Sequence, residues 1–234
     1  MPTFAYEERR GQVETYFDKT AVKNWSALTS DAPVSGIRKT VRAGRDRMRA
    51  TILEWLPRDL NGARVLDAGC GTGAFAHDAA MRGADVVAVD LAPNLIAVAK
   101  ERYADAIWPG RVDFLAGDLL DPALGQFDYV VSMDALIHYE PRVAVDVIGQ
   151  IAERASQGIV FTFVPRTAAL SLMFAVGRCF PQSRDGAPSI NLVSERAISR
   201  QLAESRALVD WDQGRTERVN SGFYTSQAME ITRA

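Results

Sequence analysis

The chain has 234 residues, of which 47% are hydrophobic and 24% are charged, a balance typical of a single soluble globular domain. The 27 basic and 29 acidic side chains leave a net charge of −2, which argues against nucleic acid as a partner. Two cysteines and two histidines are too few for a disulfide framework or a dedicated protein metal site. The first ten residues carry four charges and no apolar core, so we expect no signal peptide and a cytoplasmic location.

The first 60 residues are expected to be helical. Apolar side chains recur at helical spacing from Ile37 to Leu56. This helix should end before Pro57, because the residue that precedes a proline avoids the helical region. We therefore expect residues 1–60 to form a helical cap in the same domain unit as residues 61–234.

Short apolar segments alternate with helical segments after Gly62, a pattern that predicts a parallel sheet covered on both faces. The expected strands are Ala63–Ala68, Val86–Asp90, Val112–Leu115, Tyr129–Met133 and Ile159–Val164. The expected helices between them are Phe75–Arg82, Pro93–Arg102 and Arg142–Arg154. The fold class is therefore α/β and Rossmann-like.

The alternation stops after Pro165. Residues of about 166–192 are expected to form an insertion, and a helix over Glu195–Glu204 follows it. The last two strands, about Leu208–Val219 and Phe223–Ile231, are close in sequence. Such spacing favours an antiparallel hairpin at the edge of the sheet.

The strongest chemical signal is the segment Val65–Gly73, which reads VLDAGCGTG. Its glycines at 69, 71 and 73 let the backbone turn sharply and approach a ligand closely. Asp67 stands at the carboxyl end of the first strand, where open α/β sheets bind their ligands.

Two more carboxylates end the next two strands. Asp90 follows Gly73 by 17 residues and suits the two hydroxyls of a ribose, while Asp118 suits an adenine amino group. The loop also fits the dinucleotide fingerprint G-x-G-x-x-G/A, so a nicotinamide enzyme is an alternative. The position of Asp67, the third acid and the terminal hairpin favour S-adenosylmethionine. Taken singly, each acid has the alternative role of a helix cap.

Beyond this loop, several segments resemble the magnesium-protoporphyrin IX O-methyltransferases of bacteriochlorophyll-making phototrophs. The resemblance covers nearly the whole chain. It rests on Tyr16–Ala21 with Trp25, Val41–Arg45, Leu66–Gly73, Asp134–Tyr139, Phe161–Thr167 and Gly222–Gln227. The glycine loop is shared by the wider class I methyltransferase superfamily, whereas Asp134–Tyr139 and Gly222–Gln227 are the specific segments.

The resemblance implies a fold and a reaction. The fold is a seven-stranded sheet with a helical cap over the cofactor and an insertion over the acceptor. The reaction moves the methyl of S-adenosylmethionine to the ring C propionate of magnesium-protoporphyrin IX, giving the monomethyl ester and S-adenosylhomocysteine. Magnesium enters only as part of the porphyrin. The resemblance also implies the porphyrin-binding subunit of magnesium chelatase as a partner, and at most peripheral contact with the photosynthetic membrane.

The candidate cofactor-binding residues lie at the carboxyl ends of the first four strands. They are Asp67, Gly69, Cys70, Gly71, Gly73, Asp90, Leu91, Asp118, Leu119 and Met133. Six basic side chains crowd residues 38–49, and from these we select Arg42 as the partner of the methionine carboxylate, because arginine binds carboxylates with two hydrogen bonds. The alternative is a solvated basic face.

His138 and Tyr16 are the catalytic candidates. His138 follows the fourth strand, and its possible roles are to orient the propionate, to accept a proton or to ligate the porphyrin magnesium. Magnesium prefers oxygen ligands, which disfavours the last role. Tyr16 lies in a segment able to close over the cofactor as a lid. The alternatives are a packed histidine and an aromatic anchor.

Leu172, Met173 and Phe174, together with Tyr139, are the candidates for contact with the acceptor. The first three lie in an apolar run within the insertion, and such an adaptable wall suits a flat tetrapyrrole. An ordinary core helix and weak membrane association are the alternatives for this run.

Three other functions compete with this interpretation. A methyltransferase of a quinone or another small hydrophobic acceptor would carry the same glycine loop. A nucleic-acid methyltransferase is disfavoured, because Met133–Leu136 lacks the Pro-Pro-aromatic motif that amino-methylating DNA enzymes carry after the fourth strand. A cofactor-binding scaffold without activity is the third.

Overall fold

The computed structural model describes residues 3–21, 36–168, 170–171 and 188–234. Its strands are β1 (Arg64–Ala68), β2 (Asp85–Asp90), β3 (Arg111–Ala116), β4 (Phe127–Ser132), β5 (Ala155–Pro165), β6 (Leu192–Val193), β7 (Trp211–Ser221) and β8 (Tyr224–Arg233). Its helices are α1 (Phe4–Thr15), α3 (Gly36–Trp55), α4 (Ala74–Met81), α5 (Pro93–Arg102), α6 (Pro141–Ala152) and α8 (Glu195–Glu204). Shorter helical segments are the π-helical η1 (Tyr16–Ala21) and the single turns η2 (Pro122–Leu124), η3 (Leu136–His138) and η5 (Arg206–Leu208).

Seven of the eight strands lie in the order β3-β2-β1-β4-β5-β8-β7, and β6 pairs with the end of β5 beside this path. Strands β1 to β5 run parallel, whereas β8 is antiparallel to β5 and β7 is antiparallel to β8. The predicted mostly parallel sheet with an antiparallel edge hairpin is confirmed. The two-residue strand β6 is an addition that the sequence pattern did not indicate.

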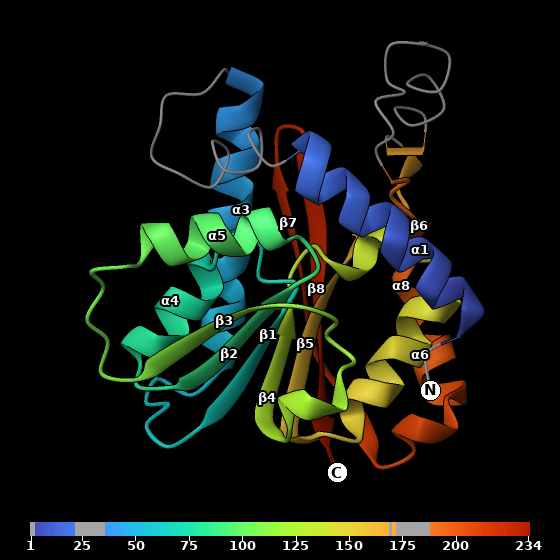
Figure 1. The fold of residues 1–234 in the computed structure, drawn as a ribbon. Coiled ribbons are helices and arrows are strands. Elements are labelled where there is room, and N and C mark those ends of the chain that lie inside the picture. The colour runs from blue at the N-terminus through green and yellow to red at the C-terminus, as the bar shows by residue number, and fades with distance from the viewer. Residues whose placement is uncertain (1–2, 22–35, 169, 172–187) are drawn as a thin grey trace.

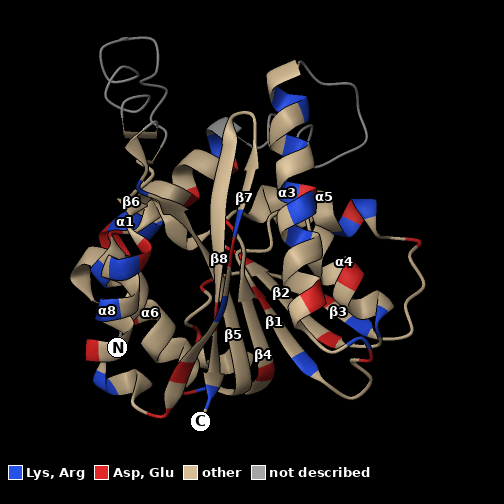
Figure 2. Ribbon diagram, turned by 180° about the vertical axis from the view of Figure 1, so that it is seen from behind, with Lys and Arg blue, Asp and Glu red and all other residues tan. Residues whose placement is uncertain are grey.

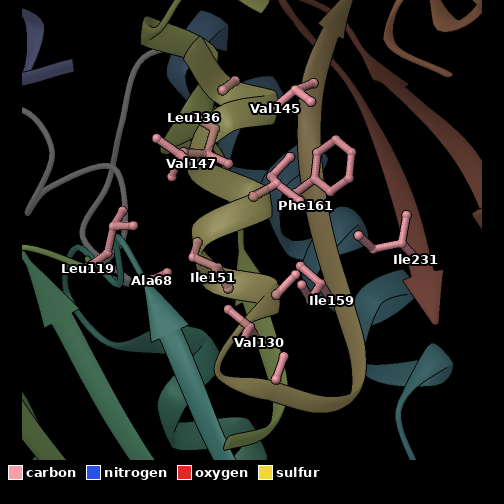
Figure 3. Packing of buried hydrophobic residues seen from close by; sticks show 14 of the residues in the cluster. Ala68, Leu119, Val130, Leu136, Val145, Val147, Ile151, Ile159, Phe161 and Ile231 are labelled. Carbon is pink, nitrogen blue, oxygen red and sulfur yellow. The ribbon is translucent and has the colours of Figure 1, made fainter. Parts of the chain in front are cut away.

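Both faces of the sheet are covered, because successive side chains of a strand point to opposite sides. Leu66 packs into a core with α6 and α8, while its neighbour Val65 packs into a second core with α3, α4 and α5. Figure 3 shows part of the first core, in which Ile151 of α6 faces Ile159 of β5. This double burial explains why the parallel strands read as continuous apolar runs.

Within the described part of residues 1–60, residues 4–21 and 36–55 are helical. Tyr6 of α1 belongs to the first core and Met48 of α3 to the second, so both helices are packed against the sheet. Figure 1 shows α1 in dark blue above α6, and α3 packs against β7 and β8. The strand order reverses at β1, between β2 and β4, which is where such sheets bind ligands.

Some sequence predictions concern residues outside the described part of the chain. Trp25 and the proposed acceptor wall of Leu172, Met173 and Phe174 are among them. Of the insertion over about 166–192, the structure describes only the two ends. Among the described residues, no helix is long and apolar enough to span a membrane.

Candidate active site

A pocket opens at the carboxyl ends of β1, β2 and β4, and residues of α1, η1 and α3 line its other side. Its lining consists of Val13, Phe17, Arg45, Gly69, Gly71, Val89, Asp90, Leu91, Leu95, Gly117, Leu119, Met133, Asp134, Ala135, His138 and Tyr139. A smaller pocket adjoins it, sharing Arg45, Gly69 and Met133 and adding Arg49, Asp67, Cys70, Thr72, Ala74 and Phe75. We call the first the main pocket and the second the side pocket.

The glycine loop between β1 and α4 forms the floor of both pockets. Gly69, Gly71 and Gly73 have φ angles of 83°, 56° and 79°, a region that residues with a Cβ atom rarely adopt. A Cβ atom on Gly69 would overlap the side chain of Ala135, and one on Gly73 would overlap Phe114. The loop therefore requires glycine for its conformation and for its close packing.

Asp67 lies beneath this loop and is only 2% exposed. Its Oδ2 atom has no hydrogen-bond partner in the described structure. Burial, reinforced by the nearby charge of Asp90, raises the pKa of Asp67 to about 7. The backbone of Ala76 hydrogen-bonds to the carboxylate and opposes this shift. A buried carboxylate oxygen without a partner is costly, so Oδ2 is suited to a cationic group that enters the side pocket.

Asp90 ends β2 and lines the main pocket. Its Oδ2 accepts a hydrogen bond of 2.8 Å from the backbone N–H of Gly71, and its Oδ1 accepts one of 2.9 Å from Ala92. Burial raises its pKa, and these two N–H groups oppose the shift. The carboxylate is thereby fixed in orientation, and each oxygen still has a lone pair able to accept from a hydroxyl.

Asp118 is engaged by the N-terminal helix. Its Oδ1 accepts hydrogen bonds from the hydroxyl of Tyr6 at 2.5 Å and from the backbone of Leu120 at 2.8 Å, and its Oδ2 pairs with Arg10 at 2.8 Å. The main pocket is lined by Gly117 and Leu119 but not by Asp118. The described contacts of Asp118 thus tie α1 to the end of β3, and its role as an adenine partner stays a prediction.

The positions of basic residues along α3 are blue on the ribbon in Figure 2. Among these residues, Arg45 reaches the pockets. It lines both of them, and its Nη1 donates a hydrogen bond of 2.7 Å to Asp134. Arg42 is half-buried one turn earlier and lines neither pocket. Arg49 lines the side pocket and pairs with Asp78 at 2.7 Å.

His138 lines the main pocket from η3 and is 8% exposed. Burial and the charge of Arg9 lower its pKa to about 4, against the opposing effect of hydrogen bonding to the backbone of Pro188 and Ser189. The imidazole is therefore neutral at pH 7, and its Nδ1 has no hydrogen-bond partner in the described structure. Arg9 also holds this segment by donating to the His138 carbonyl oxygen at 2.7 Å.

Aromatic side chains surround His138. Phe17 of η1 lines the main pocket, and its ring lies 5.3 Å from the imidazole. Tyr16 packs edge-on against Phe17 at 5.2 Å but does not line either pocket. Tyr139 lines the main pocket and stacks on Tyr6 at 5.2 Å.

The structure thus brings most of the predicted site residues together. Gly69, Gly71, Asp90, Leu91, Leu119, Met133, His138 and Tyr139 line the main pocket, and Asp67 and Cys70 line the side pocket. Sequence reasoning missed Phe17 and Asp134, and it preferred Arg42 to Arg45. Phe17 follows the chosen Tyr16 and Arg45 lies on the same helix as Arg42, so the sequence pattern did not show which of these side chains faces the pocket. Among the described residues, no group of three or more His, Cys, Asp or Glu side chains is arranged to hold a metal ion.

Comparison with known proteins connects this geometry to a family. Residues 132–233 match the family described as magnesium-protoporphyrin IX methyltransferase C-terminus, and residues 65–158 match a general methyltransferase domain. The magnesium-protoporphyrin O-methyltransferase of Rhodobacter capsulatus is 46% identical to this chain over 96% of the chain and 97% of that protein. The chain belongs to the magnesium-protoporphyrin O-methyltransferase family.

Solved structures agree with this membership. Magnesium protoporphyrin IX methyltransferase from Synechocystis, solved with bound S-adenosylhomocysteine, aligns with a TM-score of 0.84 at 26% identity, covering 96% of this chain and 100% of that one. The predicted fold class and family resemblance are thereby confirmed. A relative named ubiquinone biosynthesis O-methyltransferase, from Xylella fastidiosa, is 36% identical but covers only 50% of this chain and 48% of its own length.

Proposed function

We propose that this chain transfers the methyl of S-adenosylmethionine to the ring C propionate of magnesium-protoporphyrin IX, yielding the monomethyl ester and S-adenosylhomocysteine. The observation that carries the proposal is one continuous site with two distinct ends. Oδ2 of the buried Asp67 lies beneath the glycine loop without a hydrogen-bond partner in the described structure, and the neutral His138 lies across the main pocket. The first suits the cofactor and the second suits the acceptor.

The residues at the strand ends fit S-adenosylmethionine part by part. Asp67 would accept from the ammonium group, and Asp90 from the two ribose hydroxyls. Leu91, Leu119 and Met133 line the same pocket and would enclose the adenine ring. The cofactor supplies an electrophilic methyl group on a positively charged sulfur.

We assign the methionine carboxylate to Arg45 in preference to Arg42. Arg45 lines both pockets, next to Asp67 in the side pocket. The ammonium and the carboxylate of the methionine part are bound to the same carbon atom, so their protein partners must be neighbours. Bidentate recognition of a carboxylate is the geometry that a guanidinium favours.

No proton needs to be removed from the acceptor. A propionate has a pKa of roughly 4, by analogy with glutamate, and is ionised at pH 7. Its oxygen forms the bond to the methyl carbon as the carbon–sulfur bond breaks, and the electron pair of that bond stays on sulfur. The protein therefore contributes alignment and the exclusion of water.

A neutral His138 is consistent with such a step. A strong positive charge beside the propionate would stabilise the ground-state carboxylate and slow the transfer. We propose that His138 orients the propionate by donating the single N–H of its neutral ring, and that Phe17 and Tyr16 shield the reacting atoms from water. Tyr139, together with Leu172, Met173 and Phe174, is proposed to contact the porphyrin.

Transfer of a labelled methyl group tests this function. Magnesium-protoporphyrin IX, metal-free protoporphyrin and a quinol precursor are offered as acceptors under identical conditions. We expect the magnesium porphyrin to be methylated fastest, on one propionate. Preferred methylation of the quinol would support the alternative hydrophobic acceptor, and binding of the cofactor without transfer to any acceptor would support the scaffold.

Two proposals concern partners beyond the site. We propose that the porphyrin-binding subunit of magnesium chelatase delivers the substrate, and that any contact with the photosynthetic membrane is peripheral. Faster methylation of chelatase-bound porphyrin than of free porphyrin would support the first. Flotation with vesicles of photosynthetic lipids, reversed by high salt, would support the second.

A further inference from the structure

Three segments that carry the family resemblance have Arg45 as their one residue with a role in the reaction proposed above. They are Val41–Arg45 in α3, Asp134 at the start of Asp134–Tyr139, and Gly222–Gln227 at the turn into β8. Although they are far apart in sequence, their side chains meet around Asp134.

Asp134 is a buried acceptor with several donors. It is 9% exposed and lines the main pocket. Its carboxylate accepts from Arg45 Nη1 at 2.7 Å, from the hydroxyl of Tyr224 at 3.1 Å, and from the hydroxyls of Ser226 and Thr162 at 3.2 Å each. A carboxylate with four donors has little freedom to rotate.

The backbone at Asp134 is also constrained. Its φ angle is 57°, and within the described ranges it is the one non-glycine residue with a positive φ. Its own N–H donates to Thr162 Oγ1 at 2.7 Å. Strained backbone persists where surrounding contacts hold it in place, and such strain is concentrated at functional sites.

The C-terminal hairpin sets the position of α3 as well. A Cβ atom on Gly44 would overlap the ring of Tyr224, so the helix approaches the hairpin as closely as a glycine allows. Ser221 donates from its hydroxyl to the carbonyl oxygen of Thr40 at 2.8 Å. Tyr224 therefore contacts Gly44, the residue before Arg45, with its ring, and Asp134, the hydrogen-bond partner of Arg45, with its hydroxyl.

We propose that Asp134 is a positioning residue for cofactor binding, holding the Arg45 guanidinium where it binds the methionine carboxylate, with Tyr224 and Ser226 fixing Asp134 in turn. This inference rests on the proposed function, because it assigns a role to a group of S-adenosylmethionine. The Arg45 and Asp134 side chains are 16% and 5% exposed. The charge-assisted hydrogen bond between them restricts where the guanidinium lies.

The test separates positioning from general support of the fold by using two ligands. S-adenosylhomocysteine carries the methionine carboxylate, whereas 5′-methylthioadenosine has the same adenosine and thioether without it. The variants are Asp134→Asn, Arg45→Ala and the combination of the two. Asparagine keeps the shape of aspartate and tolerates a positive φ. Arg47→Ala is the matched control, since Arg47 is an exposed arginine on the same helix.

Equilibrium binding is measured by calorimetry, with thermal unfolding as a check on folding. We expect Asp134→Asn to weaken S-adenosylhomocysteine binding by about tenfold, the scale of one charge-assisted hydrogen bond. It should leave 5′-methylthioadenosine binding nearly unchanged and add no further loss in the Arg45→Ala background. Arg47→Ala should bind both ligands as the native chain does.

Several results would overturn the inference. Equal weakening of both ligands would assign Asp134 to the fold alone, and an additive loss in the Arg45→Ala background would show that it does not act through Arg45. If Asp134→Asn does not fold, Tyr224→Phe provides the test, because it removes one donor and keeps the ring against Gly44. Tyr224→Phe should then weaken only S-adenosylhomocysteine. Failure of the native chain to bind S-adenosylhomocysteine would contradict the proposed function itself, whether or not the chain binds 5′-methylthioadenosine.

Discussion

The two ends of the active site respond to the same environment in opposite directions. Asp67, at the end proposed to bind the cofactor, is 2% exposed, and burial raises its pKa to about 7. His138, at the end proposed to bind the acceptor, is 8% exposed, and burial lowers its pKa to about 4. A medium of low polarity disfavours charge on either kind of group, so it moves an acid up and a base down.

The two ends are expected to differ in how ligand binding changes their protonation. A cation in the side pocket would favour the ionised form of Asp67, so cofactor binding and proton release should be coupled. His138 starts neutral, and an ionised propionate beside it needs no proton removed. Asp67 should therefore become negatively charged when the cofactor binds, whereas His138 is proposed to act on the acceptor in its neutral form.

The largest expected effect concerns the acceptor end. His138→Ala should lower turnover by about 100-fold, the low end of what a positioned acid–base group contributes. The affinity for S-adenosylmethionine should stay nearly intact, as measured by calorimetry. His138→Gln, which keeps a hydrogen-bond donor, should recover part of the rate.

His77→Gln is the control for this change. His77 stacks on Tyr103 and accepts a hydrogen bond of 2.9 Å from Trp108, away from both pockets. Glutamine retains an acceptor for Trp108, so the activity should be preserved. Full activity of His138→Ala would reduce His138 to a packing residue.

At the cofactor end, two carboxylates at neighbouring strand ends should behave differently. Asp90→Ala should weaken S-adenosylmethionine binding by roughly 1–3 kcal/mol, because ribose hydroxyls lose their acceptor. Asp118→Asn should instead loosen α1, because it weakens the contacts with Tyr6 and Arg10. Calorimetry and limited proteolysis of α1 measure the two effects. An equal loss of affinity in both variants would restore Asp118 as a direct adenine partner.

The coupling of Asp67 to the cofactor predicts a pH dependence. Below its pKa of about 7, Asp67 must lose a proton to pair with an ammonium group. The affinity for S-adenosylhomocysteine should therefore rise with pH by up to about tenfold per unit and level off above pH 7. Calorimetry in buffers of different ionisation enthalpy should detect the released proton. Asp67→Asn should bind more weakly and without this pH dependence.

The smallest effect is on the stability of the ligand-free chain. The folded pKa of Asp67, about 7, lies above the usual aspartate value of 3.8, so its contribution to stability is lost as pH rises between these values. The folded pKa of His138, about 4, lies below the usual histidine value of 6.5, so stability is gained as pH rises across that range. The two slopes oppose each other between pH 4 and 6.5.

Replacing one of the two residues should reveal the contribution of the other to the pH dependence of stability. In chemical unfolding, Asp67→Asn should gain stability relative to the native chain as pH rises, by less than about 1.4 kcal/mol per unit. His138→Gln should show the opposite relative slope. Parallel curves of unfolding free energy against pH for the native chain and both variants would mean that burial does not shift the pKa values of Asp67 and His138.

Local patterns predicted most of the fold. Helices α5 and α8 begin and end at the expected residues, Pro93–Arg102 and Glu195–Glu204. In α5, the proline occupies the first turn, where its missing N–H costs nothing. In α8, Ser194 caps the helix by accepting from the backbone of Ala197. Such signals lie within a few residues of the boundary that they set.

The parts that were missed depend on contacts between distant residues. Which of Arg42 and Arg45 faces the pockets depends on the rotation of α3 about its axis. The packing of Gly44 against Tyr224, which is 180 residues away in the chain, restricts that rotation. The engagement of Asp118 by Tyr6 joins residues 112 apart. Strand β6 has only two residues and thus no periodicity to detect. The sequence shows which acidic residues end the strands, but it does not show which distant residues form hydrogen bonds with them.

The central claim is that transfer requires alignment and no proton removal. The single-turnover rate of methyl transfer from bound S-adenosylmethionine to magnesium-protoporphyrin IX, measured from pH 5.5 to 8 at saturating ligands, tests it most directly. The account predicts a flat profile, because the propionate is ionised throughout this range and no proton has to be removed from it. A rate that rises with one ionisation in this range, and loses that rise in His138→Gln, would contradict the account and identify His138 as a general base.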